Sequence, residues 1–364
     1  MVETKQKTIN NEIVLQCLLE NAFDFLERGI EQFEHEPKYS VINFCSAVEL
    51  FLKARLLKEH WALVVAKNPK MDEFLKGDFK SINFVDLIPA IKNITNENIH
   101  PDAQKCFANL ATHRNKMVHF YHAITNSDST TDDIEKIVIE QCRVWIHLKQ
   151  LFATWNFIFS KYANKIDNLD KEMQKANRQK YLQAKFEKLK DEINRKQKEG
   201  SIFINCPTCS YLSMLEENVS ENIYKGHCWV CDKKMTLLKI NCPECDNEII
   251  VNENNIEQDS ILCENCKHIL TKDDLLNIMD SNPPTKDNYF EKFPINCSYC
   301  GGYHSVVEHN DKYICLNCLE YDDNIEYCEW CSEGQLGGDL EYSFEAGCEF
   351  CEGHAGWHNN YEDE

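Results

Sequence analysis

Several features are missing from this sequence of 364 residues, and each absence excludes a class of protein. No run of roughly 18 apolar residues, the length that crosses a bilayer, is present. The richest apolar segment, 144–159, is interrupted by polar residues. The opening residues, MVETKQKTIN, contain no apolar stretch resembling a signal peptide. We therefore expect a cytoplasmic protein that makes no membrane contact.

Arginine is absent after Arg195, and lysine is scarce beyond the same point. From residue 201 onward the chain carries 32 of its 60 acidic residues but only 9 of its 39 Lys and Arg, leaving 28 acids and 30 bases before it. Such a surface lacks the cations that neutralise nucleic-acid phosphates. We expect the acidic part to bind a protein or another, basic partner.

The distribution of cysteines changes at the same place in the chain as the distribution of charge. Cys17, Cys45, Cys106 and Cys142 stand alone, and we expect them to be small core residues. The other 16 of the 20 cysteines form eight Cys-x-x-Cys pairs. A disulfide framework would need an oxidising compartment, which the start of the chain does not indicate. Two pairs around each tetrahedral zinc ion, four sites in all, is the better interpretation.

A repeated lead-in predicts how the pairs combine. The tripeptides FIN, KIN and PIN precede Cys206, Cys242 and Cys297, which favours sequential units and disfavours interleaved pairing of the RING kind. The units resemble zinc ribbons, and because each ligand set is full we expect structural zinc and no catalytic metal. The predicted sets are Cys206, Cys209, Cys228 and Cys231; Cys242, Cys245, Cys263 and Cys266; Cys297, Cys300, Cys315 and Cys318; and Cys328, Cys331, Cys348 and Cys351.

The first half of the chain repeats apolar residues at intervals of three and four, which is typical of amphipathic helices. We expect a mainly α N-terminal bundle, a charged helical linker, and then small β-rich tandem zinc-ribbon modules. Within the bundle, helices are expected over 11–33, after Pro37, over 102–122 and over 132–159. The expected domain boundaries are 8–166 for the bundle, 167–200 for the linker, and 201–235, 236–285, 290–323 and 324–358 for the modules.

One segment of the helix expected over 102–122 has a pattern that is typical neither of a buried face nor of a solvent-exposed face. Arg114 falls in the middle of the apolar stripe of this helix, where an arginine needs a partner or a function. On the adjacent flank, Asn115 and His119 are four residues apart, and His119 and His122 are three apart. This edge of the helix is therefore expected to be polar and basic.

An earlier helix, AVELFLKA at 47–54, carries Glu49 and Lys53 four residues apart. With this helix and the Arg-Asn-x3-His motif, residues 11–165 resemble a HEPN domain. HEPN domains are often metal-independent endoribonucleases that dimerise to form a shared cleft, whereas others have lost catalysis. The resemblance implies an RNA substrate, a homodimer through the helical domain and, frequently, a toxin or antiviral role.

The resemblance also implies a role for each residue of the motif. His119 would act in acid/base chemistry on the ribose 2′-hydroxyl or the leaving oxygen, giving 2′,3′-cyclic phosphate and 5′-hydroxyl ends. Arg114 would stabilise charge on the phosphorane, and Asn115 would orient the scissile phosphate. Supporting candidates are Glu49, Lys53 and His122.

Two other functions stay open on the sequence alone. The first is a non-catalytic HEPN and zinc-ribbon adaptor, in which Arg114 pairs with a buried acid such as Glu49. The second is a nucleic-acid-binding regulator that uses its zinc ribbons. It would require basic stripes on the ribbons, and the lack of arginine after Arg195 disfavours it.

Overall fold

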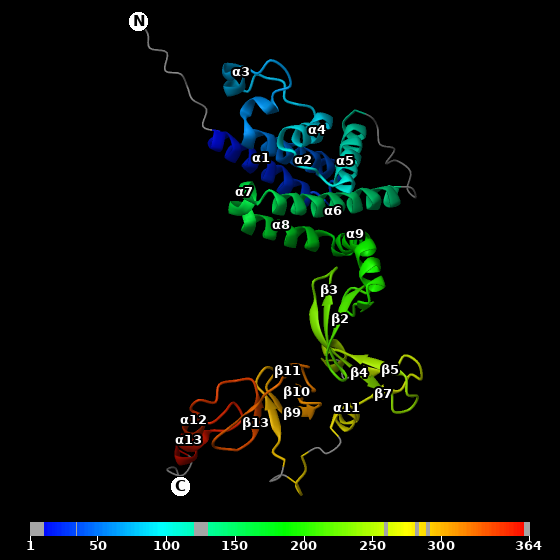
Figure 1. Cartoon of the computed structure of the whole chain (residues 1–364), viewed down its shortest axis with the longest axis vertical. Helices are drawn as coiled ribbons and strands as arrows, with labels where there is room; N and C mark the ends of the chain where they lie inside the picture. The colour runs from blue at the N-terminus through cyan, green and yellow to red at the C-terminus, as the bar shows by residue number, and fades with distance from the viewer. Residues whose placement is uncertain are drawn as a thin grey trace. The chain divides into compact units, whose positions relative to one another are not determined.

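The structure of the chain is a computed structural model that describes residues 11–33, 35–119, 130–257, 261–280, 284–288 and 292–359. The chain splits into two compact units, Met1–Asp191 and Glu192–Glu364 (Figure 1). The first is helical and the second is rich in β-strand, as the sequence predicts. In the described ranges, no helix is both long enough and apolar enough to cross a membrane.

The helical unit contains the four helices that periodicity predicts, together with several shorter ones. Figure 1 shows α6 and α8 lying side by side. The last helix, α9, runs across the boundary between the units. The elements are α1 (Asn11–Glu31), α2 (Pro37–Glu59), η1 (Trp61–Val64), α3 (Met71–Lys76), α4 (Phe84–Thr95), α5 (Pro101–His119), α6 (Thr130–Thr154), α7 (Asn156–Phe159), η2 (Ser160–Tyr162), α8 (Ala163–Ala176) and α9 (Arg178–Lys198).

Four phenylalanines form the centre of the helical core, one each from α1, α2, α6 and α7. The ring centroid of Phe51 lies 5.0 Å from that of Phe23 and 4.8 Å from that of Phe152, both edge-on. Phe159 lies 4.4 Å from Phe152. Each of the four is at most 3% exposed. Such ring pairs add about 0.5–1.5 kcal/mol each beyond their buried area, so this cluster fixes how the helices pack.

The helix expected over 132–159 is interrupted near its end. Trp155, the residue after α6, leaves the helical conformation with φ −93° and ψ 37°. Its indole N–H donates to Glu97 at 2.8 Å, and Glu97 also accepts two bonds from the buried Arg55 at 2.8 and 2.9 Å. The interruption therefore coincides with a partly buried polar network, and α7 beyond it places Phe159 in the phenylalanine cluster.

The separate, solvated linker expected over 167–200 needs correction, because α8 and most of α9 belong to the helical unit. Asp170 on α8 accepts hydrogen bonds from the Trp145 indole at 2.7 Å, the Lys149 ammonium at 2.6 Å and the Tyr181 hydroxyl at 2.9 Å. These bonds join α6, α8 and α9. The buried apolar residues of the two helices are Leu169, Met173, Tyr181, Leu182, Ala184 and Ile193.

The Asp170 carboxylate should therefore stabilise the helical unit. We expect Asp170→Ala to lower the free energy of unfolding by about 3 kcal/mol, because it leaves a lysine and an indole without their acceptor. The measurement is amide hydrogen exchange in α6 and α8. The exposed Asp167→Ala, one turn earlier, is the matched control, with an expected change within about 0.5 kcal/mol. Equal protection of these helices in the two variants would contradict this account.

The C-terminal unit is made of short strands and turns. Five strands form an antiparallel sheet in the order β1-β2-β3-β4-β5, six form a second sheet in the order β11-β10-β9-β8-β13-β12, and β6 pairs with β7. The elements are β1 (Ile202–Asn205), β2 (Leu212–Ser220), β3 (Ile223–Cys228), β4 (Lys234–Asn241), β5 (Glu248–Val251), α10 (Glu253–Glu257), β6 (Ile261–Leu262), β7 (Ile269–Leu270), α11 (Lys272–Met279), β8 (Ile295–Cys297), β9 (Gly302–His309), β10 (Lys312–Cys315), β11 (Tyr321–Asp322), β12 (Glu326–Tyr327), β13 (Gly334–Leu336), α12 (Ser343–Ala346) and α13 (Gly353–Asn359).

These sheets run across the module boundaries that the sequence predicts. β4 pairs with β3 of the first module and then leads directly into Cys242 of the second. β13, which follows the first cysteine pair of the fourth module, pairs in parallel with β8 of the third, with Leu336 opposite Cys297. One hydrophobic cluster includes Ile223, Leu275 and Ile314 from the first three modules. The modules therefore share sheets and a hydrophobic cluster and are not separate domains.

Candidate metal centres and a charged cluster on the helical unit

The Cys-x-x-Cys pairs form tight turns of one kind with one exception. In seven of the eight, the residue after the second cysteine has a positive φ between 59° and 66°. This left-handed residue turns the chain back on itself and brings both sulfurs to one side of the turn. The exception is the pair Cys348 and Cys351, which is flanked by Gly347 at φ 80° and Gly353 at φ 65°. A Cβ on Gly347 would lie 2.1 Å from the Cys351 carbonyl oxygen, so this turn requires glycine.

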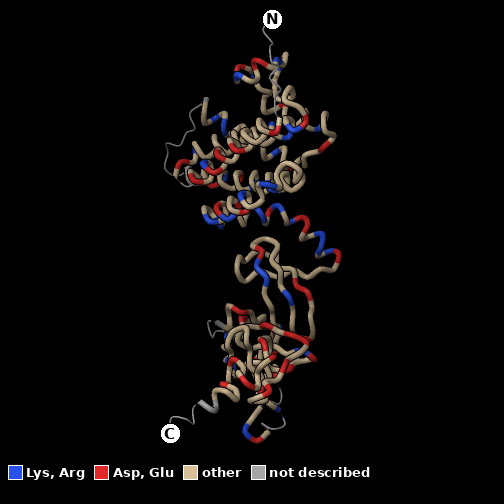
Figure 2. The backbone as a smooth tube through the Cα atoms, turned by 90° about the vertical axis from the view of Figure 1, so that its left-hand side faces the viewer, with Lys and Arg blue, Asp and Glu red and all other residues tan. Residues whose placement is uncertain are grey.

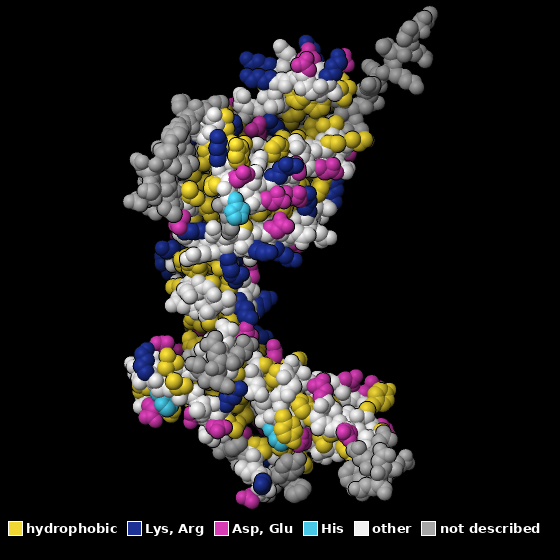
Figure 3. All heavy atoms as spheres, turned by 180° about the vertical axis from the view of Figure 1, so that it is seen from behind, with side chains coloured by type: hydrophobic (Ala, Val, Ile, Leu, Met, Phe, Trp, Pro, Cys, Tyr) yellow, Lys and Arg dark blue, Asp and Glu magenta, His cyan; other side chains and the backbone are white. Residues whose placement is uncertain are grey.

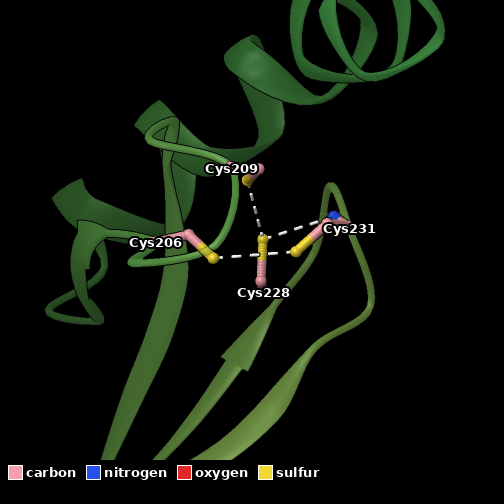
Figure 4. Close-up of side chains that lie close together, drawn as sticks. All are labelled: Cys206, Cys209, Cys228 and Cys231. Atoms are coloured by element: carbon pink, nitrogen blue, oxygen red, sulfur yellow. Dashed lines mark hydrogen bonds between the residues drawn. The ribbon is translucent and has the colours of Figure 1, made fainter. Parts of the chain in front are cut away.

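The turns bring the sulfurs together in the four sequential sets that the sequence predicts, and every set lies within 4.8 Å. Figure 4 shows the first site, where the Cys206 and Cys231 sulfurs lie 3.6 Å apart, as do those of Cys209 and Cys228. In the other three sites the corresponding distances are 3.6–3.9 Å. A tetrahedron with zinc–sulfur bonds of about 2.3 Å requires about 3.8 Å between sulfurs. All four clusters thus fit structural zinc.

Hydrogen-bond donors surround several of these sulfurs. The Ser213 hydroxyl lies 3.1 Å from the Cys228 sulfur, and the Asn265 side-chain amide donates to the Cys245 sulfur at 3.4 Å. The Asn265 bond, aided by the Asn247 backbone N–H, lowers the pKa of Cys245 to about 6. Zinc binds the thiolate, so such donors favour the form of cysteine that the metal needs.

Loss of one ligand should release one zinc ion. We expect Cys228→Ser to reduce the zinc content from four ions to three, because serine does not replace a thiolate at a tetrahedral site. Native mass spectrometry of the purified chain measures the count. Cys17→Ser, which changes an exposed cysteine outside the sets, should retain four. Four ions in both variants, or none in the unmutated chain, would contradict the assignment.

The Asn265 bond should set the acid sensitivity of the second site. Asn265→Ala removes a donor to the Cys245 thiolate, so protons should displace zinc from this site at a higher pH than in the unmutated chain. Zinc release during acid titration, followed with a chromogenic chelator, measures the shift. Asn254→Ala, in the same module, should leave the titration unchanged. An identical release curve for Asn265→Ala would show that the bond is unimportant.

On the helical unit, three charged residues taken from two separate sequence motifs lie together. The Lys53 ammonium donates to one Glu49 oxygen at 2.5 Å and to the Ser81 hydroxyl at 2.9 Å. Arg114 Nη2 lies 4.0 Å from the other Glu49 oxygen. The Lys53 side chain is 10% exposed and that of Arg114 is 30% exposed. This Glu49–Lys53–Arg114 cluster connects α2 with α5.

Arg114 is less buried than its position in the apolar stripe predicts. Its side chain hydrogen-bonds Cys45, and burial raises the pKa of that thiol. A guanidinium carries five N–H donors, and within the described ranges Glu49 and Cys45 are its polar contacts. Arg114 therefore places a partly exposed guanidinium at the edge of the cluster.

The other motif residues are placed only in part. Asn115 is exposed on α5. His119 is the last residue of α5, but its side chain lies outside the described part, and His122 lies outside the described residues altogether. The structure thus joins Arg114 to Glu49 and Lys53, and the expected cluster of Asn115, His119 and His122 stays a prediction.

A cavity that the sequence did not indicate lies where α5, α6 and α9 meet, with a volume of about 260 Å³. Glu140, His147 and Lys188 are among its lining residues. Burial lowers the pKa of His147 to about 4 and that of Lys188 to about 8. Glu140 and His147 lie two turns apart on α6, whereas Lys188 comes from α9, so the packing of α9 against α6 brings the lysine to the other two.

Comparison of the chain with models of protein families, with curated proteins and with solved structures finds no match. The function must therefore be inferred from the residues themselves.

Proposed function

We propose that the helical unit is a metal-independent endoribonuclease and that the acidic zinc-site unit recognises a protein partner or restrains the nuclease. The observation that supports this best is the Glu49–Lys53–Arg114 cluster. Its members were singled out from two motifs about 60 residues apart, and they meet at one partly buried place in the unit. The resemblance to HEPN domains further implies a homodimer with a shared cleft and a role as a toxin or antiviral effector.

The proposed chemistry assigns one task to each motif residue. His119 either takes the proton of the ribose 2′-hydroxyl as that oxygen attacks phosphorus or gives a proton to the 5′-oxygen as its bond to phosphorus breaks. The products are a 2′,3′-cyclic phosphate and a 5′-hydroxyl. Arg114 donates to the phosphorane oxygens, and Asn115 orients the phosphate. Glu49 is a positioning residue, because it lies between Lys53 and Arg114.

Charge supports assigning RNA to the helical unit. Figure 2 shows basic and acidic residues intermingled along its helices, whereas acidic residues predominate along the zinc-site unit. With 32 acids against 9 bases from residue 201 onward, the zinc-site unit would repel a phosphate backbone.

The Arg114–Glu49 contact also favours one alternative, a non-catalytic adaptor in which this pair only holds α5 to α2. The two functions differ in the effect of Glu49→Gln. In the adaptor, this change lowers stability alone. In the nuclease, it also lowers the rate of cleavage by protein that is still folded, because Arg114 loses its positioning partner.

RNA cleavage tests the nuclease directly. Structured and unstructured RNAs, labelled at one end, are incubated with the full chain in buffer without added divalent metal, and the product ends are identified. We expect His119→Ala and Arg114→Ala to reduce cleavage at least about 100-fold. Lys116→Ala removes an exposed charge from the same helix and should retain most of the activity.

Two results would contradict the proposed mechanism. One is equal cleavage by the unmutated chain, His119→Ala and Arg114→Ala, which would indicate a contaminating nuclease. The other is no cleavage by the unmutated chain across RNAs and candidate activators, which would favour the adaptor.

A further inference from the structure

A groove lined by tyrosine and glutamate lies beside the six-stranded sheet where the third and fourth modules meet. Its volume is about 600 Å³, within the range of about 300–1,000 Å³ typical of ligand sites. Strands β9, β10 and β12 contribute Glu308, Tyr313 and Tyr327, and Glu329 follows in the first turn of the fourth zinc site. Figure 3 shows hydrophobic side chains among acidic ones on the surface of this unit.

The two tyrosines of the groove are held in place by the strands to which they belong. Tyr313 packs against the buried cluster that contains Ile295 and Leu336, and in the β9–β10 ladder it lies directly opposite Glu308. Tyr327 is 54% exposed and belongs to β12, whose register with β13 is fixed beside the fourth zinc site. One tyrosine is therefore held by the core, while the other offers its ring to solvent.

The carboxylates of the groove, Glu308 and Glu329, are exposed and form no ion pair with the described residues. Lys292 also lines the groove, but its ammonium is bound to both oxygens of Asp280, at 2.8 and 3.0 Å. Two negative charges thus remain unneutralised beside two tyrosine rings.

We propose that this groove binds an arginine side chain of a basic protein segment. A guanidinium can lie against a tyrosine ring while its planar donors pair with a carboxylate, so both features of the groove are used at once. The surrounding excess of acids over bases attracts such a segment from a distance and repels nucleic acid.

This inference rests on the partner role in the proposed function, which it makes specific, and it does not depend on RNA cleavage. Cleavage is read from RNA ends and groove occupancy from peptide binding, so the failure of one leaves the other standing.

The test uses the full-length, zinc-loaded chain and a fluorescein-labelled Gly-Ser-Arg-Arg-Arg-Ser-Gly peptide, with binding followed by fluorescence anisotropy. Peptides with lysine or glutamate in place of the three arginines give the comparison. The double variant Glu308→Gln/Glu329→Gln should bind the arginine peptide at least about tenfold more weakly. The control Glu217→Gln/Glu244→Gln removes two exposed charges elsewhere in the unit and should change binding less than about twofold.

A second pair of variants tests whether a tyrosine ring of the groove contributes to binding. Tyr327→Leu should weaken the arginine peptide about threefold, and more than it weakens the lysine peptide, because guanidinium stacks on a ring better than ammonium does. Tyr342→Leu, which changes a tyrosine that is 71% exposed and outside the groove, is the control. Zinc content is checked in every variant by native mass spectrometry, so that unfolding is distinguished from loss of binding.

Three results would overturn the proposal. The first is no binding of the arginine peptide by the unmutated chain at about 1 mM, the weak end of specific recognition. The second is an equal loss in the two double variants, which would mean that attraction depends on total charge rather than on the groove. The third is binding of the glutamate peptide, or of an oligouridylate, that the groove variants abolish.

Discussion

Coordination of one zinc ion by four thiolates is the interaction on which the C-terminal unit depends. Modules of this size bury too little apolar surface to fold alone, whereas structural zinc contributes about 10–16 kcal/mol per site in finger peptides. Left-handed residues close seven of the eight turns, and two glycines flank the eighth. The strands that enter these turns then join into shared sheets, so each site also anchors part of its neighbour.

The dependence of the fold on zinc also limits the functions that this unit can have. Because every site has a full set of four cysteines, the metal serves the fold, and the proposed recognition of a partner falls to the side chains that project from the sheets. Acidic residues predominate in this unit, and the groove adds the exposed ring of Tyr327 beside two glutamates. The helical unit differs, since its acids and bases are balanced and several of them form ion pairs, such as Lys53 with Glu49 within α2 and Lys149 on α6 with Asp170 on α8. We infer that the two units have different partners.

The sequence predicts some of these features well for physical reasons. Cys-x-x-Cys spacing is a local constraint, so the eight pairs could be read directly, and the lead-in repeated before Cys206, Cys242 and Cys297 favoured the sequential sets that the structure shows. The pairing of Leu336 with Cys297 between β13 and β8 is non-local and has no sequence signature. The charged sequence over 167–200 gave no sign of the partly buried Asp170, because its partners Trp145 and Lys149 lie on another helix. Helical periodicity placed Arg114 in the core, whereas Glu49 and Cys45 hold it half-exposed.

The central claim of this account is that RNA is bound by the helical unit and not by the zinc-site unit. The most direct measurement is photo-cross-linking of a 4-thiouridine-labelled RNA to the full-length, zinc-loaded chain, with the modified peptides identified by mass spectrometry. The account predicts cross-links on α5 and on α2 near Lys53, and none between residues 201 and 359. Cross-links concentrated in the zinc-site unit, with α2 and α5 unmodified, would contradict it.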